Sequence, residues 1–150
     1  MANALLLAFI LATIERLGQF HQVNPAIIAA IVEVESGFNP LAVGDDRSSY
    51  GLMQLHIGGA GGGHPPSQLL EIENNLEFGI QYFKRCLEAT NYSLPDALSA
   101  YNQGIQGWRD RGAGFNQLYV DLVLGVLPKY EDPGLPKLVI THLSQLDIYT

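Results

Sequence analysis

Residues 24–40, NPAIIAAIVEVESGFNP, decide the fold of this chain. Asn24 can cap a helix and Pro25 is tolerated in a first helical turn, so this pair predicts the start of a helix. A mostly apolar run follows and reaches Ser36, directly before Gly37. Because glycine commonly follows the last residue of a helix, the sequence predicts a helix that ends at Ser36.

The two glutamates of this helix occupy different faces. At 100° per residue, Glu35 falls within about 60° of Ile28 and Ile31, whereas Glu33 lies on roughly the opposite, solvent-facing side. Apolar neighbours and the negative end of the helix dipole both disfavour ionisation, so they predict a raised pKa for Glu35. A carboxylic acid protonated near neutral pH can act as the general acid of glycosidic cleavage. The pattern also fits a rim carboxylate that reaches solvent or pairs with an arginine such as Arg47.

Composition restricts the classes of function. The chain has 150 residues, of which 47% are hydrophobic, and this fits one domain with a real core. Its net charge of −7 argues against direct binding to nucleic acid or to an anionic membrane. A lone Cys86 excludes an intrachain disulfide and a multi-cysteine zinc site. The four histidines lack paired ligand spacing, so we expect no metal site.

The rest of the chain predicts a mainly α domain with one long irregular segment. Helical spacing or capping signals mark residues 67–90, 93–104 and 115–127, and Pro128 is expected to break the chain. No stretch alternates as a strand would. We therefore expect one domain over residues 1–130, and a tail over 131–150 that folds back on the domain or docks on a partner.

Glycines dominate the irregular segment, which covers residues 41–66. The run GGAGGG at 58–63 lacks the Lys-Ser/Thr ending of a phosphate-binding loop. Long loops are commonly functional or mobile. We interpret this one as a flexible rim of a groove that binds a polymer.

The N-terminus carries an apolar run at residues 4–14, ALLLAFILATI. A bilayer span needs about 20 residues, and a secretory signal needs a basic region that residues 1–3 do not provide. The sequence predicts a packed first helix, with neither a cleaved signal nor stable membrane insertion.

Three motifs around Glu35 point to a known family. ESGFNP at 35–40, GLMQ at 51–54 and AYNQG at 100–104 occur in that order. Together they resemble the soluble lytic transglycosylases, which have a goose-lysozyme-like α fold and cleave the glycan strands of bacterial peptidoglycan. The resemblance covers about residues 13–130. One departure is the sequence Asn-Gln-Leu at 116–118, where the family often has Glu-Thr-Arg.

The resemblance implies a role for each matching residue. Glu35 would be the catalytic acid/base that cleaves the β-1,4 bond between N-acetylmuramic acid and N-acetylglucosamine, leaving a 1,6-anhydro end, with no cofactor. Met53 would pack beside the cleft, and Tyr119 would orient or polarise Glu35. The residues implied to line the cleft near the scissile sugar are Ser36, Gln54, Tyr101 and Asn102.

Two other functions stay open at this point. A goose-type lysozyme (a muramidase) would hydrolyse the same bond with water and needs a second carboxylate, for which Asp45 and Asp46 are the candidates. A non-catalytic peptidoglycan-binding virion protein on the same scaffold would need no acid at position 35. The transglycosylase is the first expectation.

A further expectation concerns how the protein reaches the bacterial cell wall. The weak match to an export signal, the small size and the acidic charge favour a bacteriophage enzyme. It could be held by phage tail proteins in the virion, or be released to the bacterial periplasm and cell wall. A bacterial enzyme with an uncleaved N-terminal signal is the alternative.

Overall fold

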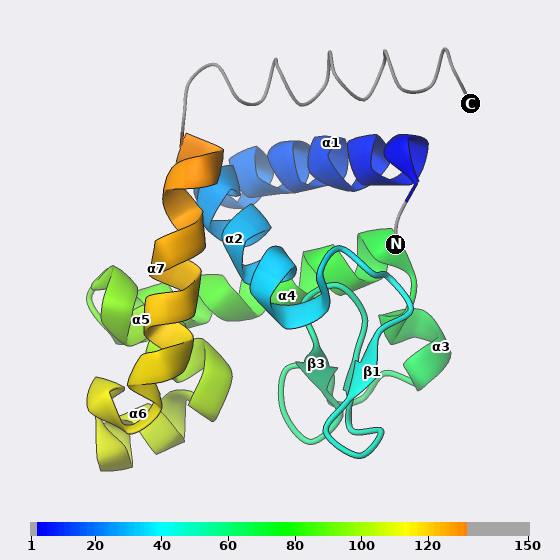
Figure 1. The fold of residues 1–150 in the computed structure, drawn as a ribbon. Coiled ribbons are helices and arrows are strands. Elements are labelled where there is room, and N and C mark those ends of the chain that lie inside the picture. The colour runs from blue at the N-terminus through cyan, green and yellow to red at the C-terminus, as the bar shows by residue number, and fades with distance from the viewer. Residues whose placement is uncertain (1–2, 132–150) are drawn as a thin grey trace.

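The computed structural model describes residues 3–131 (Figure 1). The predicted tail, 131–150, falls outside them except for its first residue. The helices are α1 (Ala4–His21), α2 (Pro25–Ser36), α3 (Pro66–Leu69), α4 (Ile72–Ala89), α5 (Leu94–Gln103), α6 (Ile105–Arg111) and α7 (Gln117–Glu131), with a short 3-10 helix, η1 (Ala113–Asn116). The strands are β1 (Val43–Gly44), β2 (Ser49–Tyr50) and β3 (Leu55–His56). The expected mainly α class is confirmed.

Helix α4 runs through the middle of the molecule (Figure 1). It contacts α1, α3 and α5, while α2 contacts α1 and α7. Its buried face carries Leu76, Ile80 and Phe83, all with no exposed surface. Apolar residues at this spacing form one stripe of a helix, so burying the stripe gathers the other helices around α4.

Helix α2 forms as the sequence predicts. The Asn24 side chain accepts a hydrogen bond from the Ala26 backbone N–H (2.9 Å), which caps the helix. Gly37 adopts φ 59° and its N–H donates to the carbonyl of Glu33, so glycine ends the helix in the left-handed conformation. Ile28 and Ile31 are fully buried.

Two expectations about the other helices were wrong, and one helix was missed. The helix expected over 67–90 is divided into α3 and α4 at Leu70 and Glu71. Helix α6 was not predicted. Helix α7 continues through Pro128 to Glu131. Near a helix end, proline removes only one of the last hydrogen bonds, which tertiary contacts can offset.

Those contacts come from Glu33, which is not the simple solvent-facing residue that the helical wheel predicted. Its Oε1 accepts hydrogen bonds from Lys129 Nζ (2.8 Å) and from Tyr130 Oη (2.5 Å). Partial burial would raise the pKa of Glu33, but these hydrogen bonds and the charge of Lys129 lower it. The carboxylate therefore holds the last turn of α7 against α2.

A small sheet occupies the segment expected to be irregular. Its order is β1-β2-β3, both pairs are antiparallel, and Tyr50 pairs with Val43 and with Leu55. Each strand has two residues, which is too short to produce a visible alternation of polar and apolar positions.

Helix α1 packs as predicted through one face only. Ile10, Ile14 and Leu17 are buried, whereas Leu5 and Phe9 are exposed. Among the described residues it is the one helix long and apolar enough to cross a membrane, a test that core helices and signal sequences also pass.

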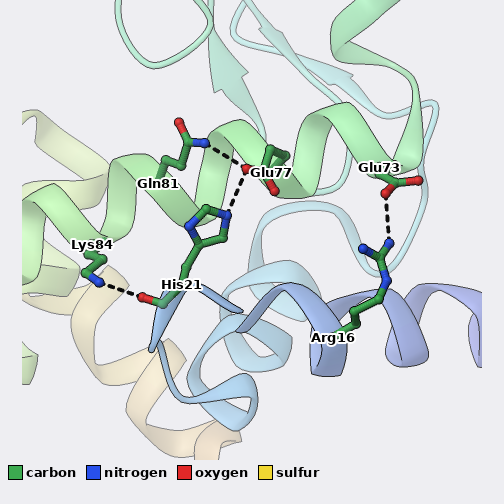
Figure 2. A network of polar contacts seen from close by, with 6 residues as sticks. All are labelled: Arg16, His21, Glu73, Glu77, Gln81 and Lys84. Carbon is green, nitrogen blue, oxygen red and sulfur yellow. Dashed lines mark hydrogen bonds and ion pairs between the residues drawn. The ribbon is translucent and has the colours of Figure 1, made fainter. Parts of the chain in front are cut away.

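Polar contacts fasten α1 to α4 (Figure 2). Arg16 pairs with Glu73 at 2.8 Å, near the middle of α1. At its C-terminal end, Nε2 of His21 lies 2.8 Å from Oε1 of Glu77, and Lys84 Nζ donates to the His21 carbonyl (2.7 Å).

One buried side chain connects the sheet to α4. Asn75 has no exposed surface. Its Nδ2 donates to the carbonyls of Tyr50 (2.8 Å) and Leu69 (2.7 Å), and its Oδ1 accepts from the Met53 N–H (2.8 Å). A Cβ on Gly51 would lie 2.3 Å from that Nδ2, so only glycine permits this approach. Asn75 thereby fixes the backbone of residues 50–53.

We expect Asn75→Ala to lower the free energy of unfolding by about 3 kcal/mol or more, because buried backbone groups lose their partners. Urea unfolding measures the change. Asn74→Ala is the matched control, since the Asn74 side chain hydrogen-bonds to Glu71 at the surface, and its effect should stay within about 0.5 kcal/mol. Equal effects of the two substitutions would contradict the role given to Asn75.

Candidate active site

A hollow of about 320 Å³ opens between the end of α2, the sheet, the glycine-rich loop, α4 and α5. Among the residues that line it are Glu35, Asp45, Ser49, Gln54, His56, Tyr82, Tyr101 and Asn102, with Gly58, Gly59 and Ala60 from the loop. The loop is thus a wall of this hollow, as the rim interpretation predicted.

Glu35 lies in the last turn of α2 and contributes its carboxyl to the hollow. Burial raises its pKa from 4.5 to about 7; the nearby hydroxyl of Tyr119 acts in the opposite direction, and the charge of Asp45 raises the pKa further. The raised pKa agrees with the sequence prediction. Within residues 3–131 the salt bridges do not involve Glu35, so the alternative of an arginine pair is not present. The carboxyl can therefore hold a proton near neutral pH.

Tyr119 comes to Glu35 from α7, which packs on α2. Its hydroxyl is buried, and it has no partner at ordinary hydrogen-bond distance among the described residues. It still lies near enough to influence Glu35. Burial first, and then the charge of Glu35, raises the pKa of Tyr119 well above its usual value, so the hydroxyl stays protonated. As a protonated donor near the carboxyl, it favours the ionised form of Glu35.

Tyr101 and Met53 form a second layer of the site. The Tyr101 hydroxyl donates to the Met53 carbonyl (2.6 Å), while the ring of Tyr101 lines the hollow. Met53 is fully buried and its sulfur packs against Gly79, where a Cβ would lie only 2.3 Å away. Met53 does not line the hollow, which fits a packing role.

Only some of the polar residues that the resemblance implies for the cleft line the hollow. Gln54 and Asn102 line the hollow. Gln54 Nε2 donates to the carbonyl of Ala42 (3.1 Å), and Asn102 Oδ1 accepts from Asn116 Nδ2 (2.9 Å). Ser36 is not among the lining residues, and its hydroxyl donates back to the Val32 carbonyl (3.1 Å). A helix hydroxyl bonded to its own preceding turn is less available to a ligand.

Only one of the two aspartates reaches the hollow. Asp45 lines the hollow, and its Oδ2 accepts a hydrogen bond from Ser49 Oγ (2.6 Å). Asp46 is exposed and does not line it. Of the two candidates for a second carboxylate, the structure therefore brings only Asp45 to the same hollow as Glu35.

Sequence reasoning missed Tyr82, which lines the hollow from α4. Its ring centroid lies 5.6 Å from that of Tyr101, with the planes tilted by 50°. Helix periodicity could have found it, because Tyr82 follows Gly79 by three positions and shares its face. Ser49 was also missed, and nothing in its local sequence marks it. Gln103 belongs to the AYNQG motif, but no role was predicted for it.

Neither a reactive thiol nor a metal cluster stands out among residues 3–131. Burial raises the pKa of Cys86 to about 12, so its thiol stays protonated. Within the described ranges, no three His, Cys, Asp or Glu side chains lie together as a metal ion would require.

Comparison with protein families adds an independent finding. Residues 12–117 match the transglycosylase SLT domain. The chain belongs to this family. Membership implies a peptidoglycan-cleaving function of the lytic transglycosylase type, with peptidoglycan as the substrate. The matched range contains Glu35, Gln54, Tyr101 and Asn102, and it ends two residues before Tyr119.

The neighbours of Glu35 can be tested on this SLT-domain protein without substrate. Asp45→Asn should lower the pKa of Glu35 by a few tenths of a pH unit, because it removes a repelling charge, and Tyr119→Phe should raise it, because it removes a donor to the carboxylate. A ¹³C NMR titration of the Glu35 carboxyl measures both. Asp46→Asn is the charge-matched control and should leave the titration unchanged. Shifts of the same sign in the Asp45 and Tyr119 variants would contradict this account.

Proposed function

We propose that Glu35 is the acid/base of a lytic transglycosylase that cleaves the β-1,4 bond between N-acetylmuramic acid and N-acetylglucosamine. The observation that carries the proposal is a carboxyl group with a pKa of about 7 at the wall of an open hollow, in a chain of the SLT family. A catalytic acid is most effective when its pKa lies near the working pH.

Glu35 acts twice in the proposed reaction. It first gives its proton to the bridging oxygen, so that the bond from the muramyl C1 breaks and the glucosaminyl hydroxyl leaves. The carboxylate then takes the proton of the muramyl C6 hydroxyl, whose oxygen bonds to C1 of the same sugar. The product is a 1,6-anhydro end, no water is consumed, and Glu35 regains its proton.

The surrounding groups suit this substrate. Amide groups of Gln54 and Asn102 can bind sugar hydroxyl and N-acetyl groups, and the ring of Tyr82 can pack against a sugar face. Tyr119 supports the carboxylate when Glu35 has given up its proton, since a hydrogen bond to an ionised acceptor is stronger than one to a neutral group.

One observation favours a second candidate, hydrolysis. Asp45 lines the same hollow as Glu35 and acts on its charge. A carboxylate in that position could orient a water molecule on the far side of the sugar, as in inverting glycosidases.

Product analysis distinguishes the two reactions. Digestion of purified sacculi, followed by mass spectrometry of the muropeptides, should give 1,6-anhydro ends, which are lighter by one water than reducing ends. Glu35→Gln should lower the rate at least about 10²-fold, because it removes the proton donor. Asp45→Asn should still yield anhydro ends.

Two other results would contradict the proposal. If the wild type releases only reducing ends, and if Asp45→Asn abolishes their release, the protein is a hydrolase. No release of muropeptides, with Glu35→Gln indistinguishable from the wild type, would identify a non-catalytic binding protein.

We also propose delivery by a bacteriophage particle. The chain has a net charge of −7, so it gains no long-range attraction to an anionic envelope. An enzyme that a carrier delivers to the wall does not need such attraction. When the full chain is expressed in a bacterium and the cells are fractionated, it should stay in the cytoplasmic fraction. Enrichment in the periplasm would favour a bacterial enzyme with its own export signal.

A further inference from the structure

A second hollow, of about 640 Å³, lies on the other side of the glycine-rich loop. Gly59 and Ala60 line both hollows, so the two adjoin across a wall that carries almost no side chains. The rest of the second hollow comes mainly from α4, through Lys84, Arg85 and Glu88 among others, and from His21 at the end of α1.

The walls of this second hollow are held in place. The His64 ring stacks on Phe78 with centroids 4.1 Å apart and planes 13° apart, which fixes the end of the loop on α4. On the opposite side, Lys84 holds the His21 carbonyl, and Glu77 holds the His21 ring (Figure 2). The hollow is therefore preformed.

The charge of the side chains that line the second hollow contrasts with the net charge of the whole chain. Lys84 and Arg85 contribute two cations to the lining, against the single carboxylate of Glu88. Glu77, which is half-buried and does not line the hollow, is engaged by His21 and Gln81. In a chain with a net charge of −7, this local excess of positive charge favours an anionic ligand.

Arg85 connects the two hollows. Its guanidinium lies 5.3 Å from the centroid of the Tyr82 ring, and Tyr82 lines the first hollow. A guanidinium over an aromatic ring keeps its donors free for a carboxylate at its edge. An anionic group that extends from a ligand in the first hollow would meet Arg85 first.

We infer that the second hollow binds the carboxylates of the stem peptide carried by the muramyl sugar in the first hollow. This inference rests on the proposed function for its substrate. An extended peptide covers about 3.3–3.6 Å per residue, so a stem of three or four residues spans about 10–14 Å. Such a stem would pass over Gly59 and Ala60, which line both hollows. Lys84 and Arg85 bind the peptide carboxylates, and the His64 ring can hydrogen-bond to its amides.

Binding is tested first, without turnover, in the Glu35→Gln protein. By isothermal titration, a synthetic muramyl tripeptide with free carboxylates should bind, and the same compound with amidated carboxylates should bind about three- to tenfold more weakly. Arg85→Gln should reduce this difference, because only Lys84 then remains to bind the carboxylates, and Arg85→Lys should retain more of it than Arg85→Gln. Arg109→Gln, which removes the same charge from an exposed position on α6 outside both hollows, is the control and should retain the difference.

Equal binding of the two compounds, or equal losses in the Arg85 and Arg109 variants, would overturn the inference. Cleavage gives a second readout: the ratio of kcat/KM on peptide-bearing strands to kcat/KM on strands stripped of peptide should exceed one, and should fall about three- to tenfold in Arg85→Gln. An unchanged ratio would also overturn it. The two proposals fail separately, because the titration does not depend on whether Glu35 is the acid.

Discussion

The site depends on three hydrogen bonds made by one buried amide. Asn75 holds the carbonyls of Tyr50 and Leu69 and the N–H of Met53, and so it fixes the turn between β2 and β3 against α4. The Met53 carbonyl in turn receives the Tyr101 hydroxyl. Three walls of the first hollow, the sheet, α4 and α5, are thus connected through a single side chain. Since an unpaired buried polar group costs about as much as a hydrogen bond gains, the alternatives to this arrangement are unfavourable.

Helix α2 shows how environment separates two identical side chains. Glu33 and Glu35 are two residues apart, yet the pKa of Glu33 is lowered and that of Glu35 is raised to about 7. Glu33 receives donors from the last turn of α7, which stabilise its charged form. Glu35 is buried and faces the charge of Asp45. The same contact between α2 and α7 that binds Glu33 also brings Tyr119 to Glu35, so the structural glutamate helps to position the group beside the reactive one.

The sequence predicted the parts of this arrangement that local chemistry controls. The cap at Asn24, the helix end at Gly37 and the raised pKa of Glu35 follow from residue type and helix period. The sheet could not be predicted, because pairs of two-residue strands depend on contacts with Asn75 more than 20 positions away in the chain. The same limit applies to Pro128, since the contacts that keep α7 helical beyond it come from Glu33, 95 positions earlier. Tyr82 was missed for a different reason, because its helix face was read only as core.

The buried hydroxyl of Tyr119 has a consequence for the proton of Glu35. Burial keeps this hydroxyl protonated, so it remains a donor in both charge states of the carboxyl. A donor stabilises an ionised carboxylate more than a neutral acid, and Tyr119 therefore opposes the effect of burial on the pKa of Glu35. Burial alone would hold the proton too firmly for release, whereas a strong donor alone would leave no proton to give. The packing of α7 on α2 thus sets how readily one carboxyl can both lose and regain its proton.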